Sequence, residues 1–180
     1  QEMCDTLRGK HLVFVGDANN VARSVFHACA LAGVRFTMLG PKEYAMPQKL
    51  IDSFTTIHGV TFEQTENSKT ALQDADFVYT DVWVSMGQEA EAEQRKKAFA
   101  AYQLNESLMA LAPSHAKVLH CLPAHRGLEI TDGVIDHAQS IVIQQAGNRM
   151  HLQKGLLVWF ALQNGQIDAD LLKQHGLSVA

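Results

Sequence analysis

The strongest constraint on the fold of this chain is a repeated order of a short β-rich run followed by a segment with helical spacing. The first run is HLVFV at His11–Val15, and apolar residues at helical spacing follow at Val21–Ala32, up to a glycine. A second run, Val34–Leu39, ends at a Gly-Pro pair and precedes a helical segment at Pro47–His58. This alternation predicts parallel strands, because each helix returns the chain to the same edge of the sheet.

The remaining segments keep this order. The predicted strands are Val60–Phe62, Phe77–Thr80, Lys117–Leu119 and Ile141–Ile143, and the predicted helices are Asn67–Gln73, Glu106–Ala112, Arg149–Gln163 and Asp168–Gln174. A polar stretch rich in Glu, Gln, Lys and Arg lies at Ser85–Ala98. We therefore expect an α/β fold with a doubly wound, mostly parallel sheet, helices on both faces, and a single domain over residues 1–180.

Charge and cysteine content argue against several classes of protein. The formal net charge is -4, and the longest basic run, Arg95-Lys96-Lys97, is interpreted as a solvated helix face, so nucleic acid is not an expected partner. No apolar stretch approaches the ~20 residues that cross a bilayer, so no membrane association is expected. Three widely spaced cysteines without a CxxC pair predict neither a disulfide framework nor a zinc site and fit a reducing cytoplasm.

The segment VLHCLPAHRG at Val118–Gly127 places polar and reactive side chains directly after an apolar run. Pro123 lacks a backbone donor and cannot lie inside a sheet, so His120, Cys121 and Leu122 should lie where the strand leaves the sheet. In open α/β sheets, ligands bind at the carboxyl ends of the strands. We therefore predict a ligand site at this turn.

Three identities are open for Cys121: a buried structural thiol, a covalent nucleophile, or a polar group that touches substrate without forming a bond. A nucleophile would need His120 or His125 within reach, and the opposite orientation of adjacent strand residues argues against His120. Otherwise the two histidines and Arg126 are interpreted as hydrogen-bonded scaffolding. Metal binding is not expected, because no partner carboxylate lies at ligand spacing.

The turn GDANN at Gly16–Asn20 stands where a dinucleotide-binding fold carries its glycine-rich loop. Ala18 replaces the second glycine of GxGxxG, so the backbone cannot closely approach a pyrophosphate and no nicotinamide cofactor is expected. Either Asn19 or Asn20 should cap the helix that follows, which leaves the other asparagine free for a ligand.

Two further positions carry candidate binding groups. Asp81 follows the strand Phe77–Thr80 and either pairs with an ammonium group or caps the strand end. Ser85 and Met86 then add a hydroxyl and a flexible apolar surface. Arg149 is predicted to begin the last helix, where a helix N-terminus and a guanidinium together suit a phosphate or carboxylate; the alternative is a surface salt bridge.

Four motifs together resemble the ornithine-binding half of ornithine carbamoyltransferase. In the order of that family they are GDANN at 16–20, TDVWVSMGQE at 80–89, HCLPAHRG at 120–127 and GNRMHLQKGLL at 147–157. The resemblance implies a Rossmann-like half of a transcarbamylase. It also implies that the N-terminal domain, whose STRTR-type loop binds carbamoyl phosphate, is absent from this chain, which begins with Gln and would start inside a longer protein or after processing.

The resemblance further implies contacts with both substrates. Asn20, slightly favoured over Asn19, would contact the α-amino and carboxylate groups of L-ornithine, and Asp81, Ser85 and Met86 would lie on a mobile loop that closes over ornithine. Cys121 would lie near the δ-amine and the carbamoyl group, and Leu122 would contribute its backbone carbonyl. Arg149 would contact carbamoyl phosphate. One departure is Gly147, which stands where the family has an acidic residue.

The implied reaction is attack of the neutral δ-amine of ornithine on carbamoyl phosphate, which gives L-citrulline and phosphate without a metal or organic cofactor. Asp81 and Cys121 would be the catalytic residues that orient the amine and help to deprotonate it. Alternatives are a non-catalytic amino-acid-binding module, a dehydrogenase half, and a transferase for another amine, against which the SMG motif argues. HCLPAHRG is similar to the biosynthetic members, which implies arginine biosynthesis.

The resemblance also implies partners for this chain. Full-length members are trimers, assembled largely through the absent domain, and their last helix packs on that domain. The apolar residues Leu156, Leu157, Trp159 and Phe160 are therefore expected to be exposed here, so that the isolated chain self-associates or needs its partner domain.

Overall fold

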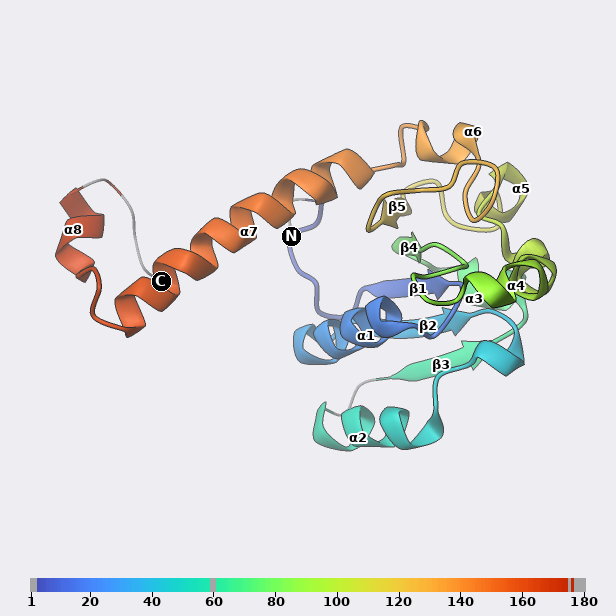
Figure 1. The fold of residues 1–180 in the computed structure, drawn as a ribbon, viewed down its shortest axis with the longest axis horizontal. Helices are drawn as coiled ribbons and strands as arrows, with labels where there is room; N and C mark the ends of the chain where they lie inside the picture. The colour runs from blue at the N-terminus through green and yellow to red at the C-terminus, as the bar shows by residue number, and fades with distance from the viewer. Residues whose placement is uncertain (1–2, 59–60, 175, 177–180) are drawn as a thin grey trace. The chain divides into compact units, whose positions relative to one another are not determined.

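The computed structural model describes residues 3–58, 61–174 and 176. The chain divides into two units, Gln1–Val142 and Ile143–Ala180, which are described separately. The first unit contains a five-stranded sheet in which every pair of neighbouring strands is parallel (Figure 1). In the order β3-β2-β1-β4-β5, the strands are Phe62–Thr65, Arg35–Leu39, His11–Val15, Phe77–Thr80 and Lys117–His120.

Helices follow the strands along the chain, as the sequence predicts. In the first unit they are α1 (Asn20–Ala32), α2 (Gln48–His58), α3 (Ser68–Leu72), α4 (Ala92–Phe99), α5 (Glu106–Met109) and α6 (Asp132–Ile135), with 3-10 turns at Lys42–Tyr44, Glu89–Glu91 and Ala100–Tyr102. The second unit is built from α7 (Val142–Gln163), whose first residue closes the first unit, and α8 (Ala169–Gln174). Among the described residues, no helix is both long and apolar enough to cross a membrane.

The sheet has a hydrophobic core on each face, which confirms the doubly wound prediction. All five residues of β1 are buried, as a central strand with two covered faces requires. Leu12 and Phe14 pack in a cluster with residues of α1 and α2, whereas Val13 and Val15 pack in a second cluster with residues of α3, α5 and α6. The alternation along a single strand therefore supplies both cores.

The register brings three chain segments to one edge of the sheet. Val15 at the end of β1 pairs with Thr80 at the end of β4, and Thr80 pairs with His120 at the end of β5. The residues that follow these strands, which include Gly16, Asp81 and Cys121, leave the sheet side by side. This is the edge at which a parallel sheet binds ligands.

The predictions for the C-terminal part of the first unit are partly wrong. Ile141–Ile143 does not form a strand: Ser140 makes an isolated parallel bridge with Val118 of β5, and α7 then begins at Val142. A run of three apolar residues is too short to distinguish a strand from a helix by its period. The helix-forming residues that follow this run belong to α7, so the helix begins earlier in the chain than predicted. The last helix therefore begins at Val142 and not at Arg149.

The other predicted elements are present: His11–Val15 and Phe77–Thr80 keep their predicted bounds, and the ends of the others shift by a few residues. The strand predicted at Val60–Phe62 lies at Phe62–Thr65, and the predicted strand residue Val60 lies outside the described residues. The polar stretch Ser85–Ala98 carries most of α4 (Ala92–Phe99), the helix on which the basic run Arg95-Lys96-Lys97 lies.

Candidate functional site

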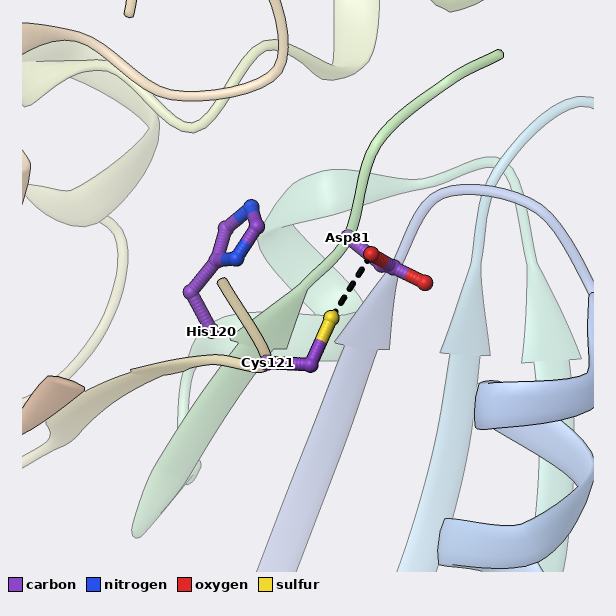
Figure 2. A group of neighbouring side chains, drawn as sticks. All are labelled: Asp81, His120 and Cys121. Carbon is purple, nitrogen blue, oxygen red and sulfur yellow. Dashed lines mark hydrogen bonds between the residues drawn. The ribbon is translucent and has the colours of Figure 1, made fainter. Parts of the chain in front are cut away.

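The candidate site lies at the carboxyl ends of β1, β4 and β5, and Asp81 is its centre. Asp81 is 6% exposed, and both of its carboxylate oxygens accept hydrogen bonds. The Cys121 thiol donates to Oδ1 at 2.8 Å, and the Val82 amide donates to the same oxygen at 2.8 Å. The side-chain amide of Asn19 donates to Oδ2 at 2.8 Å. Figure 2 shows the Cys121 sulfur facing the carboxylate, with the ring of His120 apart from both.

The two asparagines of the GDANN turn have different roles. Asn19 is the N-cap of α1, since its Oδ1 accepts from the Ala22 amide at 3.0 Å while its Nδ2 holds Asp81. Asn20 is the first residue of α1 and is exposed. The cap that the sequence assigned to one of the two is therefore Asn19, and the open side chain at the sheet edge is that of Asn20.

The thiol of Cys121 is a hydrogen-bond donor. Burial, the hydrogen bond to Asp81 and the charge of that carboxylate together raise the pKa of Cys121 to about 12. At neutral pH the sulfur is therefore protonated, which disfavours the covalent nucleophile among the three identities open for this residue. Its position beside Asp81 fits a polar group that contacts a ligand.

His120 is part of a buried scaffold beneath this group. Its Nδ1 accepts from the Leu122 amide at 2.9 Å, which leaves Nε2 as the donor to Glu129 Oε1 at 3.2 Å. Glu129 is fully buried and also accepts from the His125 amide at 2.5 Å. The histidine and the glutamate thus fix the turn that carries Cys121 and Leu122, where Leu122 adopts a left-handed backbone with φ 54°.

The ligand atoms of Asp81, His120 and Cys121 lie within 4.8 Å of one another. The ring of His120 is therefore nearer to the Cys121 sulfur than the opposite orientation of adjacent strand residues implies. A carboxylate, an imidazole and a thiol are types of metal ligand. Both ring nitrogens of His120, however, are engaged by Leu122 and Glu129. The geometry therefore favours scaffolding for His120.

Arg126 forms ion pairs on the surface of the first unit. Its Nη1 donates to Asp132 Oδ1 at 2.6 Å and to Asp136 Oδ2 at 2.6 Å, and its Nη2 donates to Asp136 Oδ1 at 2.9 Å. These bonds also hold the pKa of Asp136 below its ordinary value. Arg126 thus ties the turn after β5 to α6, which matches the scaffolding interpretation.

The remaining predicted residues lie outside the Asp81 group. Ser85 and Met86 are in the loop between β4 and α4, where the Ser85 amide donates to Gln88 Oε1 at 3.0 Å and Met86 is 98% exposed. Arg149 lies in the second unit, in the interior of α7, where it is exposed. The predicted combination of Arg149 with a helix N-terminus is therefore wrong.

Sequence reasoning missed two residues near this site. Arg95, interpreted as part of a solvated helix face, is 3% exposed and donates to Asp17 of the GDANN turn. Its partner is distant in the sequence, so no local pattern reveals the contact. Glu129 was also missed, because no local pattern predicts that this acidic residue is buried.

The protonated thiol gives a testable pH dependence. Because the pKa of Cys121 is raised to about 12, the reactive thiolate is scarce at neutral pH and its fraction should rise about tenfold per pH unit up to at least pH 10. Alkylation by iodoacetamide, followed at Cys121 by peptide mass spectrometry, measures this. Asp81→Asn removes the neighbouring charge and should move the profile to lower pH. A plateau below pH 9 in the unmodified chain would contradict the assignment.

Comparison with known proteins identifies the fold and the family. A family model described as the Asp/Orn binding domain of aspartate/ornithine carbamoyltransferase matches residues 8–160. Ornithine carbamoyltransferases of several organisms are similar in sequence. That of Oceanobacillus iheyensis is 45% identical over 160 residues, with 87% of this chain and 50% of the relative covered. That of Trichormus variabilis is 49% identical over 159 residues, with 87% and 52% covered.

The structural comparison agrees with the sequence comparison. The structure of ornithine carbamoyltransferase from Pyrococcus furiosus matches with a TM-score of 0.80 and 44% identity, covering 91% of this chain and 52% of the other. This chain therefore spans about half the length of the curated relatives that it matches. The chain belongs to the aspartate/ornithine carbamoyltransferase family, in which it corresponds to the Asp/Orn binding domain.

Proposed function

We propose that this chain supplies the L-ornithine-binding half of an ornithine carbamoyltransferase. The reaction transfers the carbamoyl group of carbamoyl phosphate to the δ-amine of ornithine and yields L-citrulline and phosphate. The observation that carries the proposal is the buried carboxylate of Asp81, held on one oxygen by Asn19 and on the other by Cys121. Of its about four lone-pair sites, the hydrogen bonds from Cys121, Val82 and Asn19 use three, which leaves one on Oδ2 to offer an amine.

The chemistry assigns different roles to Asp81 and Cys121. Attack requires a neutral δ-amine, whereas an alkyl ammonium has a pKa near ~10.4. Asp81 orients the amine and helps to remove its proton. The thiol of Cys121 is itself protonated, so it acts as the donor that holds Asp81, beside the proposed position of the carbamoyl group.

The other predicted residues hold the two substrates. Asn20, exposed at the first turn of α1, and the Ser85 hydroxyl bind the amino-acid end of ornithine. Met86, which is exposed, covers the bound amino acid when the loop closes. The Leu122 carbonyl accepts a hydrogen bond from the substrate, and Arg149 binds carbamoyl phosphate. None of these steps needs a metal or an organic cofactor.

The length comparison supports a partner domain for this half. The chain covers about half of its relatives, so we assign the remaining half to a carbamoyl-phosphate domain that completes the site. The full-length protein is proposed to be a homotrimer that acts in arginine biosynthesis in the cytoplasm.

The apolar residues of α7 should make the isolated chain associate. The exposed fractions of Leu157 and Phe160 are 70% and 53%, and Leu156 and Trp159 are also exposed. Such a stripe is a surface for protein contacts. Sedimentation velocity should detect dimers or larger species that diminish in a Leu157→Ser, Phe160→Ser variant or after addition of the carbamoyl-phosphate domain. A monodisperse monomer at high concentration, without that domain, would count against this expectation.

Calorimetric titration tests the choice of substrate. L-ornithine should bind saturably, and N-acetyl-L-ornithine and putrescine should bind roughly tenfold more weakly or worse, because each lacks groups that Asn20 and Ser85 are proposed to bind. Equal affinity for all three ligands would refute the assignment of the amino-acid end. The absence of any binding would leave the fold and remove the substrate.

A further inference from the structure

We infer that Arg95 is a positioning residue that fixes the loop at residues 84–90 to the GDANN turn at residues 16–20. The effect of this link on ornithine binding rests on the proposed function. Arg95 belongs to α4, and its exposed fraction is 3%. A guanidinium that leaves water must be paired, because an uncompensated buried charge is strongly destabilising. The partners of this one come from three separate segments of the chain.

Two of the contacts are with residues at the two ends of the loop between β4 and α4. Nε of Arg95 donates to the carbonyl oxygen of Trp83 at 2.6 Å, and Nη1 donates to Glu91 Oε2 at 3.4 Å. Trp83 and Glu91 bracket residues 84–90, the segment that carries Ser85 and Met86. A single side chain therefore contacts residues on both sides of this loop.

The third contact joins this loop to the GDANN turn. Nη2 of Arg95 donates to the carboxylate of Asp17, two residues before Asn19 in the sequence. The guanidinium carbon also lies 4.7 Å from the ring centre of Tyr44, a cation–π contact that holds it against the segment after β2. Asn20, which directly follows the linked part of the GDANN turn, and Ser85 are placed by the proposed function on the same end of ornithine, so Arg95 links the segments that carry both residues.

The arrangement requires an arginine. Its planar group has five donors, which allows contact with three acceptors in different directions while one face stacks on a ring. The ammonium of a lysine is a single point charge and cannot span them. Other hydrogen bonds of the loop, from the amides of Ser85 and Gly87 to the side chains of Gln88 and Glu89, fix its internal shape. Its placement against the GDANN turn depends on Arg95.

Hydrogen exchange and ornithine binding, both measured on the 180-residue chain, test this role. In Arg95→Lys, amides within 84–90 should exchange about tenfold faster, whereas those of β1 and β4 keep the rates of the unmodified chain. The dissociation constant for ornithine should rise about tenfold. Lys97→Gln, an exposed substitution on the same helix, is the matched control and should change neither quantity.

Asp17→Asn is a second variant that breaks the link from the other side, and it serves if Arg95→Lys fails to fold. Unchanged exchange at 84–90 in the folded variants would overturn the inference. Faster exchange with unchanged ornithine affinity would overturn the positioning role. If the unmodified chain does not bind ornithine, the proposed function fails, and the exchange rates at 84–90 alone then decide whether Arg95 holds the loop.

Discussion

Replacing Asp81 with asparagine is expected to weaken the binding of ornithine by roughly a hundredfold. Loss of one partner from a desolvated, hydrogen-bonded charge pair costs about 2–5 kcal/mol, and each 1.4 kcal/mol is about a factor of ten. The substitution keeps the size of the side chain. In the unmodified chain, Nδ2 of Asn19 donates to the carboxylate of Asp81. In the variant an amide group faces this donor, so the free energy of unfolding should fall by about 1 kcal/mol.

Calorimetry with L-ornithine, together with urea unfolding, separates these two effects. Asp136→Asn is the matched control, because it removes a carboxylate from the exposed ion pair with Arg126 and should leave ornithine binding unchanged. Similar ornithine affinities in Asp81→Asn and in the unmodified chain would show that the carboxylate does not bind the substrate.

The second large effect is expected on stability, from His120→Ala. This substitution removes the acceptor of the Leu122 amide and leaves the buried carboxylate of Glu129 without its imidazole donor. Leaving a buried carboxylate without its donor costs more than the ~1–3 kcal/mol of a neutral acceptor, and truncating a fully buried ring adds a cavity cost, for a total of about 3–5 kcal/mol. The free energy of unfolding from urea denaturation should fall by about this amount.

Two further variants make this prediction specific. His125→Ala removes a largely exposed ring and keeps the backbone amide of residue 125, which makes the 2.5 Å contact with Glu129. The free energy of unfolding should therefore fall by less than about 1 kcal/mol. In a His120→Ala background, Glu129→Gln should recover part of the loss by removing the buried charge. Equal losses for the two histidine variants would contradict a scaffolding role for His120.

The location of the site followed from sequence because it depends on local patterns. A proline after an apolar run marks the end of β5, and an acid directly after Phe77–Thr80 falls at the end of β4. The parallel register then brings Cys121 and Asp81 to one edge. Short-range spacing and the topology of the sheet therefore suffice to predict this pair.

Other features depend on contacts that no local pattern encodes. Arg95 and Asp17 are 78 positions apart, and an arginine next to two lysines on a polar helix has the composition of a solvated face. The division of roles between Asn19 and Asn20 depends on where the first turn of α1 begins. The misplaced start of α7 arose because Ile141–Ile143 suits a strand while the residues after it suit a helix.

Citrulline formation is the measurement that tests the central claim most directly. The chain is incubated with L-ornithine and carbamoyl phosphate, alone and after addition of a separately expressed carbamoyl-phosphate domain of the family. We predict citrulline on mixing and little or none from the chain alone. If the mixture forms no citrulline although both parts are folded and associate, this chain is not the ornithine-binding half of a carbamoyltransferase.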